Sequence, residues 1–128
     1  MRPDDASRYT GFPSPADFAE RSLNLHALAV THPEATFFWT ARGDGMEGAG
    51  IYSGDVLVVD RSLDPNSHDV VVVVLQGEYL VRRWHLTSEG LVLSAEHPGY
   101  PDLIITDNSC TCWGVVVWVL HNPNRKRR

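Results

Sequence analysis

The stretch that decides the fold reads ARGDGM at residues 41–46 and GIYSGDVLVVD at residues 50–60. Strand-forming residues before position 41 run into a Gly-Asp-Gly turn, and a second strand opens near Asp55. A strand that ends in a glycine turn holds the residue at its apex outward, which is the geometry that suits an exposed nucleophile. The residue at this apex is Gly45, which has no side chain with which to attack.

The rest of the chain predicts a mainly β fold. Short strands are expected at residues 35–41, 55–60, 69–75, 79–86, 91–95, 103–106 and 112–121. The five valines of residues 70–74 indicate a strand that is buried on both faces or lies at a sheet junction, and Gln76-Gly77 predicts a tight hairpin. One or two short helices precede the strands, at residues 15–21 and 24–31. We therefore expect a curled, mostly antiparallel β fold.

The composition indicates one soluble globular domain. Its charge favours protein partners over nucleic acid. The chain has 128 residues, 43% of them hydrophobic and 21% charged. Arg125, Lys126, Arg127 and Arg128 form a basic tail, and without these four charges the net charge falls from −5 to −9. An acidic body binds the phosphate backbone poorly, so the tail makes at most a weak DNA contact.

Neither a membrane segment nor a metal site is expected. The longest apolar runs, at residues 70–75 and 115–120, are far shorter than the roughly 20 residues of a membrane span, and no apolar signal core follows Met1. The predicted location is therefore the cytoplasm. Cys110 and Cys112 are predicted to be reduced, structural thiols. The six histidines lack a paired metal-binding spacing, and no cofactor is expected.

Three aspartates lie at the ends of the predicted turns and strands. They are Asp44, Asp55 and Asp60. At such positions aspartate commonly accepts hydrogen bonds from the backbone, so we interpret them as structural residues rather than a carboxylate site. The glycines of the same stretch, Gly43, Gly45, Gly48 and Gly50, are expected to serve a loop that needs positive φ angles.

The order of these motifs resembles the peptidase-like domain of the UmuD and LexA family. The matching segments are GFPSPA at residues 11–16, HPEATFF at 32–38, the stretch at 41–60, HDVV at 68–71, GEYLVRRW at 77–84 and GVV at 114–116. The resemblance implies a LexA/UmuD C-terminal-type, β-clip-like domain at residues 11–121. A flexible arm at residues 1–10 would precede it, with the basic tail at 122–128 after it. The family's self-cleavage junction falls at Thr10 and Gly11.

Both catalytic positions of that family are altered in this chain. The family's apex serine corresponds to Gly45, and its lysine corresponds to Arg82. A lysine in such a pair must lose its proton to act as base, which a guanidinium does not do. The only lysine of the chain is Lys126, in the tail, so a Ser/Lys pair inside the domain is excluded. Arg82 is expected instead to pair with Asp44 or Glu78, or to fill the space that a serine would have occupied.

The resemblance implies a role in the SOS response to DNA damage. We expect a homodimer that serves an error-prone, UmuC-like translesion DNA polymerase, with the RecA filament as a further partner. The arm before Gly11 is short, which fits a form that needs no processing. The residues expected at the dimer interface lie on the last strand: Val115, Val117, Trp118 and Val119.

Two other hypotheses compete with this interpretation. The chain would be a working self-cleaving peptidase if another hydroxyl replaced the apex serine, and the nearby candidates are Thr40, Ser53, Ser62 and Ser67. It would alternatively be the regulatory part of a LexA-type repressor. That alternative is disfavoured because no helix-turn-helix domain precedes Gly11, and such a domain needs roughly 60 more residues.

Overall fold

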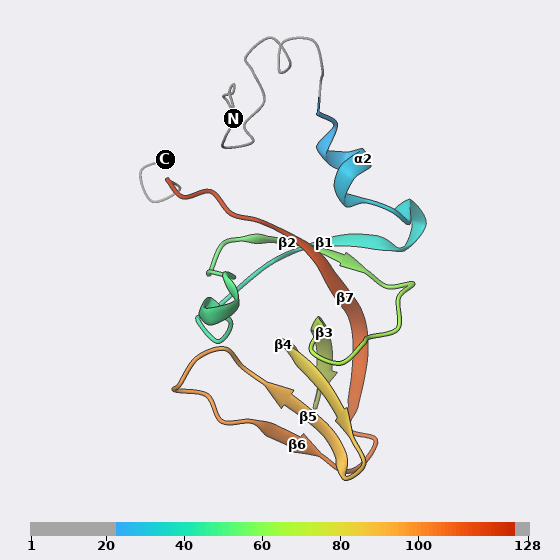
Figure 1. The fold of residues 1–128 in the computed structure, drawn as a ribbon, viewed down its shortest axis with the longest axis vertical. Helices are drawn as coiled ribbons and strands as arrows, with labels where there is room; N and C mark the ends of the chain where they lie inside the picture. The colour runs from blue at the N-terminus through green and yellow to red at the C-terminus, as the bar shows by residue number, and fades with distance from the viewer. Residues whose placement is uncertain (1–22, 125–128) are drawn as a thin grey trace, which may run out of the picture.

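The computed structural model describes residues 23–124 and shows one seven-stranded sheet in that range (Figure 1). The strands are β1 (Thr36–Thr40), β2 (Val56–Asp60), β3 (Val70–Leu75), β4 (Glu78–Thr87), β5 (Gly90–Ser94), β6 (Leu103–Ile105) and β7 (Cys110–Leu120). Their order across the sheet is β1-β2-β7-β3-β4-β5-β6, and every neighbouring pair is antiparallel. The mainly β fold class is confirmed, and each predicted strand is present with its ends within two residues.

The helices of the described part are short. They are the α-helix α2 (Leu25–Ala29) and the 3-10 helices η1 (Pro33–Ala35) and η2 (Glu47–Ala49). Asn24 caps α2, because its side-chain oxygen accepts a hydrogen bond from the Ala27 N–H at 3.1 Å. The helix ends two residues before the predicted position. Within residues 23–124, no helix is long and apolar enough to cross a membrane.

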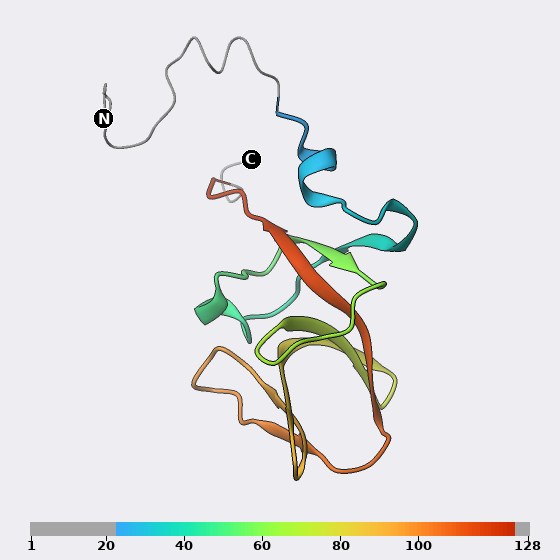
Figure 2. The same ribbon diagram turned by 45° about the vertical axis from the view of Figure 1, so that its right-hand side comes forward.

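The last strand, β7, runs along most of the molecule and joins its two ends (Figures 1 and 2). It pairs with β2 through its second half and with β3 through its first half. The register shifts once in each pairing, which leaves Val117 and Trp113 as the extra residues on β7. Such bulges bend a strand and increase its twist, so they account for the curl of the sheet.

The curl buries both faces of β3, as the valine run predicted. Val72 packs in a first core cluster with Leu57 and Val59, whereas Val71 and Val73 pack in a second cluster with Leu91 and Leu93. Each of the three valines is fully buried. A fully buried valine side chain contributes about 1.5–3 kcal/mol to stability, so β3 is the rigid centre against which β4 is placed.

The predicted hairpin fixes the position of Arg82. Gln76 and Gly77 both have positive φ angles, 52° and 80°, as a two-residue type I′ turn requires. The turn sets the register that places Arg82 opposite Val71. β5 pairs with β4 only from Arg83 onward. Among the described strands, residues 78–82 of β4 therefore pair with β3 alone, and Arg82 is the last residue of this segment.

Candidate functional site

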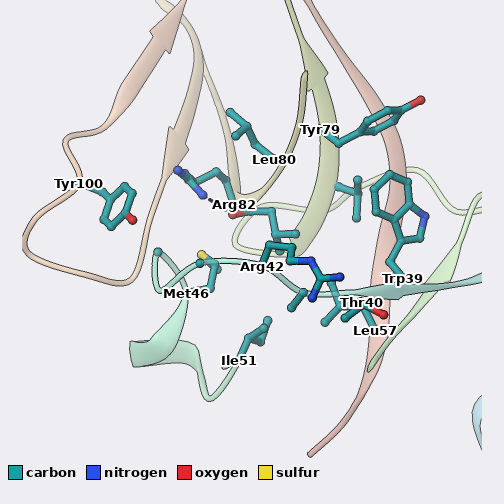
Figure 3. A pocket seen from close by; sticks show the side chains of 15 residues that line it. Trp39, Thr40, Arg42, Met46, Ile51, Leu57, Tyr79, Leu80, Arg82 and Tyr100 are labelled. Atoms are coloured by element: carbon teal, nitrogen blue, oxygen red, sulfur yellow. Dashed lines mark hydrogen bonds between the residues drawn. The ribbon is translucent and has the colours of Figure 1, made fainter. Parts of the chain in front are cut away.

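A pocket of about 290 Å³ lies between the loop that follows β1 and the first half of β4 (Figure 3). The residues that line it are Trp39, Thr40, Ala41, Arg42, Gly43, Gly45, Met46, Ile51, Leu57, Val72, Tyr79, Leu80, Val81, Arg82 and Tyr100. Gly45 and Arg82, which the resemblance aligns with the family's serine and lysine, are among them. The two residues are 37 positions apart in the sequence, and the β3–β4 hairpin brings them together.

Gly45 and Arg82 face each other directly. A Cβ atom added at Gly45 would lie 3.2 Å from Arg82 Nη1 and 3.6 Å from its Cζ. The guanidinium therefore occupies the space beside the apex of the turn. A serine at position 45 would have its hydroxyl against this cation, which donates hydrogen bonds but accepts no proton.

The backbone at position 45 does not require glycine. Gly43 and Gly50 have φ angles of +80° and +82°, as expected for this loop, but Gly45 and Gly48 do not adopt positive φ. The expectation is therefore wrong for these two. Gly48 is needed for another reason: a Cβ there would lie 2.7 Å from the Glu96 carbonyl oxygen. At Gly45 the nearest atoms to an added side chain all belong to Arg82. The guanidinium, and not the backbone conformation of the turn, therefore determines whether a side chain fits at position 45.

The loop that carries Gly45 is held rigidly in place. The Glu96 N–H donates to the Gly45 carbonyl at 2.7 Å, and the Gly48 N–H donates to the Glu96 carbonyl at 2.8 Å. Met46 and Ile51 anchor the loop in the first core cluster. These contacts fix the position of the apex relative to β4, as a catalytic site requires.

Arg82 is a half-buried cation without an ion pair among residues 23–124. The predicted ion pair with Asp44 or Glu78 is therefore wrong. Arg82 Nη1 instead donates to the Val81 carbonyl at 2.7 Å, and the guanidinium carbon lies 5.3 Å from the centre of the Tyr100 ring. Burial lowers the pKa of Arg82, but guanidinium keeps its proton at neutral pH.

Asp44 binds other partners on the far side of Tyr100. Its carboxylate accepts a hydrogen bond from the Tyr100 hydroxyl and lies 3.4 Å from His97 Nε2. The hydrogen bond from Tyr100 lowers the pKa of Asp44, and the same bond raises the pKa of Tyr100. Asp44 is therefore occupied by Tyr100 and His97 and does not neutralise Arg82.

The pocket lacks the groups that activate a nucleophile. Within the part of the chain that the structure describes, its lining includes no serine, cysteine, histidine, lysine or carboxylate. Of the four alternative hydroxyl residues, Thr40 lines the pocket, and Ser53, Ser62 and Ser67 do not. Ser62 Oγ donates to Asp60 at 2.6 Å, and Ser67 Oγ lies 3.0 Å from the exposed His68 ring. None of the three serines is positioned to replace the side chain missing at Gly45.

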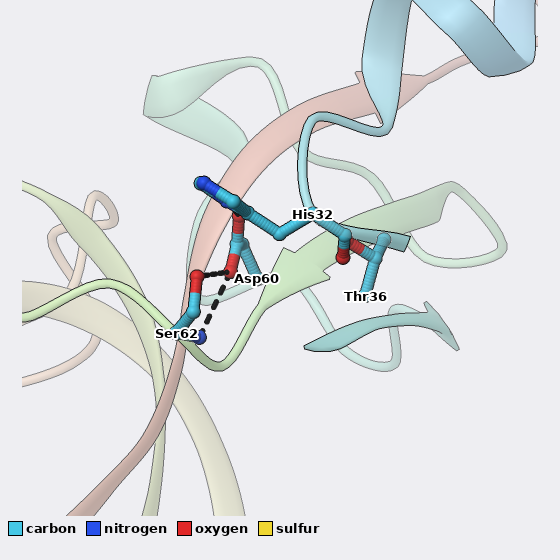
Figure 4. A network of polar contacts seen from close by, with 4 residues as sticks. All are labelled: His32, Thr36, Asp60 and Ser62. Atoms are coloured by element: carbon cyan, nitrogen blue, oxygen red, sulfur yellow. Dashed lines mark hydrogen bonds and ion pairs between the residues drawn. The ribbon is translucent and has the colours of Figure 1, made fainter. Parts of the chain in front are cut away.

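Two buried aspartates at the ends of β2 are paired with histidines. His32 Nδ1 lies 2.6 Å from Asp60 (Figure 4), and His121 Nδ1 lies 2.7 Å from Asp55. Asp55 also accepts from the Tyr52 N–H and Asp60 from the Ser62 N–H, which confirms the predicted backbone hydrogen bonds. The sequence did not indicate the histidine partners, because they lie 28 and 66 residues away.

The His32–Asp60 pair should make stability depend on pH. Its hydrogen bond raises the pKa of His32 above 6.5, so the contribution of His32 is complete below pH 6.5 and is lost as the pH rises through the folded-state pKa. Burial works to raise the pKa of Asp60, but hydrogen bonds from Ser62 and His32 outweigh it and lower the pKa below 3.8. The contribution of Asp60 is therefore present above pH 3.8 and is lost as the pH falls through the folded-state pKa.

Urea denaturation at about pH 6 and about pH 8.5 measures this effect. The urea concentration at the unfolding midpoint of the wild type should be lower at pH 8.5 than at pH 6. This decrease should be smaller in His32→Gln. His26→Gln, on the exposed side of α2, is the matched control and should behave as wild type. An equal fall in wild type and His32→Gln would contradict the assignment.

The remaining predicted sites fall in three groups. Cys110 and Cys112 are free thiols that pack against the second core cluster, and burial raises the pKa of both. No group of three potential metal ligands occurs within residues 23–124. The junction at Thr10 and Gly11, the helix at 15–21 and the tail at 125–128 lie outside the described residues.

Comparison of the sequence with those of known proteins shows the family of this chain. The chain belongs to the S24-like peptidases, whose family model matches residues 9–117. It is 39% identical over 130 residues to protein ImpA of Salmonella typhimurium, and the matched region covers 99% of this chain and 88% of ImpA. It is 42% identical over 110 residues to protein MucA of Escherichia coli, covering 83% of this chain and 74% of MucA. The resemblance to the UmuD and LexA family is confirmed.

The LexA repressor of Verrucomicrobium spinosum is a further relative. It is 34% identical over 83 residues, which are 65% of this chain and 41% of the repressor. The match to ImpA thus extends over more of both proteins than the match to this repressor. The chain is accordingly a UmuD-like member of the S24-like family.

Proposed function

We propose that this chain is a non-catalytic accessory subunit of an error-prone translesion DNA polymerase in the SOS response. The observation that carries the proposal is the pocket in which Gly45 and Arg82 face each other. Gly45 and Arg82 stand where the resemblance puts the family's serine and lysine, and a glycine supplies no nucleophile and a guanidinium no base. A protein that keeps the scaffold without the chemistry is best explained by a role in binding.

The UmuD-like relationship supports the choice of partner. UmuD-type proteins serve UmuC-like polymerases and respond to RecA filaments, and the sequence of this chain matches the family model over residues 9–117. The net charge of −5 favours a partner with a basic surface.

A homodimer is part of the same proposal, and the fold narrows the expected interface. Val115 is only 5% exposed in the second core cluster and is therefore not available on the surface, whereas Val119 is half-buried against the first core cluster. Val117 and Trp118 are exposed. The bulge at Val117 explains why two successive residues of β7 reach the surface.

Neighbouring strands extend this apolar surface. Across the sheet, Trp118 pairs with Val58, which in turn pairs with Phe38, and paired residues share one face. Phe38 is 58% exposed and Trp118 45% exposed, and Leu120 is exposed two residues further along β7. We refer to Phe38, Val117, Trp118 and Leu120 as the β7 face. A second copy of the chain would cover it around a two-fold axis.

Copurification with the cognate UmuC-like polymerase tests the proposed function. We expect the untreated full chain to bind the polymerase, and added salt that shortens the Debye length below about 10 Å should slow the association. A chain that starts at Gly11 should bind equally well. If binding appeared only after residues 1–10 were removed, the chain would be a precursor and the proposal would be wrong.

A further inference from the structure

The half-buried guanidinium of Arg82 has unused hydrogen-bonding capacity. It carries five N–H donors, and the one hydrogen bond it makes within the described residues is to the Val81 carbonyl. No carboxylate of residues 23–124 pairs with it. A partly desolvated cation without an anion is unfavourable, and a bound anion would relieve the cost.

The pocket beside Arg82 has room and a partly apolar lining, to which Arg42 adds a second guanidinium. Arg82 Nη1 lies beside the apex of the turn, 3.2 Å from where a Cβ of residue 45 would stand, and the guanidinium lines the pocket of about 290 Å³. Met46, Ile51 and Leu57 line its interior together with the Arg82 neighbour Val81. This combination suits a ligand that bears one anionic group next to apolar side chains.

An open strand edge lies next to the same pocket. β4 pairs with β3 over residues 78–83, whereas β5 joins it only from Arg83, so residues 78–82 have one unpaired edge within the described part. Antiparallel pairing alternates, which directs the backbone groups of Tyr79 and Val81 away from β3. The Val81 carbonyl accepts a hydrogen bond from Arg82 Nη1, as expected for a carbonyl that points away from β3. An extended peptide can add to such an edge as a further strand.

We propose that this pocket binds a carboxylate group of an extended peptide, with Arg82 as the anion receptor and the edge of β4 as the docking strand. The carboxylate belongs either to an acidic side chain or to a peptide C-terminus. This inference rests on the proposed function, because Arg82 is available to a ligand only where it plays no part in cleavage. Asp44 does not compete, since Tyr100 and His97 hold it. The acidic body disfavours additional negative charges on the peptide.

Nuclear magnetic resonance titration of the ¹⁵N-labelled full chain tests the proposal with three N-acetylated tetrapeptides. The first is Ala-Val-Ala-Leu with a free C-terminus, the second is its amide, and the third is Ala-Val-Asp-Leu amide. The readout is the Gly45 amide and the Arg82 Nε–H resonance. At least one carboxylate peptide should bind about tenfold or more tightly than the neutral amide, as expected for a charged hydrogen bond. Comparison of the first and third peptides identifies the source of the carboxylate.

Variants assign the preference to Arg82. Arg82→Gln should abolish the difference between charged and neutral peptides, whereas Arg61→Gln, an exposed arginine that lies outside the pocket, should retain it. Equal binding of neutral and charged peptides, no binding of any peptide, or a preference that survives in Arg82→Gln would overturn the inference. If Arg82→Gln fails to fold, the comparison of charged and neutral peptides with the wild-type chain still tests the carboxylate preference.

The same samples separate this inference from the proposed function. Intact-mass spectra show whether the chain or a peptide is cut during the titration. Cleavage would contradict the non-catalytic proposal, whatever the binding. Intact molecules without a carboxylate preference would contradict only the inference about Arg82.

Discussion

Self-cleavage should return when Gly45→Ser and Arg82→Lys are combined, and not with either change alone. The backbone at position 45 accepts a side chain, and the serine would stand beside position 82, where a lysine can act as base. Burial lowers the pKa of Arg82, and the same desolvation would lower that of a lysine, which favours its neutral form. General-base catalysis contributes about 100-fold or more.

Mass spectrometry at alkaline pH measures the cut between Thr10 and Gly11 in the four forms of the chain. The wild type, Gly45→Ser and Arg82→Lys should stay intact, and the double variant should be cut. Cleavage by Gly45→Ser alone would show that a base other than residue 82 exists. A folded double variant that stays intact even when a peptide spanning residues 5–16 is supplied would show that the pocket has lost more than two side chains.

An aspartate on the β7 face should dissociate the proposed dimer. Trp118→Asp would place two unpaired charges in a symmetric interface, one from each copy, and each costs about 3 kcal/mol or more when buried. The dissociation constant should therefore rise by about 1,000-fold or more. Val117→Asp should act in the same way.

Sedimentation at micromolar concentration measures the change. The wild type should have a mass near twice 14.3 kDa, and Trp118→Asp should have a mass near 14.3 kDa with an unchanged circular dichroism spectrum. Leu86→Asp, at an exposed leucine of β4 away from this face, is the control and should remain dimeric. Val119→Asp is unsuitable because Val119 packs against the core. A monomeric wild type, or a dimeric Trp118→Asp, would contradict the proposed interface.

Local sequence patterns predicted the fold because its elements depend on near neighbours. The valine run of β3 and the Gln76-Gly77 hairpin each follow from a few adjacent residues. The position of Arg82 opposite Gly45 followed from the family resemblance, because the two residues come from different elements of the fold. Charge alone suggests Asp44 and Glu78 as its partners, but neither forms an ion pair with it within residues 23–124.

The parts that sequence reasoning missed depend on distant partners and on strand irregularities. The Tyr100–Asp44 and His32–Asp60 bonds join residues 56 and 28 positions apart, and no local pattern marks them. The bulge at Val117 changes which residues of β7 face outward, so the strand pattern alone does not show that Val115 is buried while Val117 and Trp118 are exposed. Sequence alone does not reveal such a shift, because it depends on how β7 pairs with β2, a strand about 60 residues earlier in the chain.

The most direct test of the central claim is the intact mass of the purified full chain. The protein is incubated with RecA filament and nucleotide, and separately at alkaline pH, and a self-cleaving member of the family serves as the positive control. We predict that this chain keeps its mass of 14.3 kDa under both conditions, because Gly45 supplies no nucleophile and Arg82 no base. A specific cut between Thr10 and Gly11 would contradict the account.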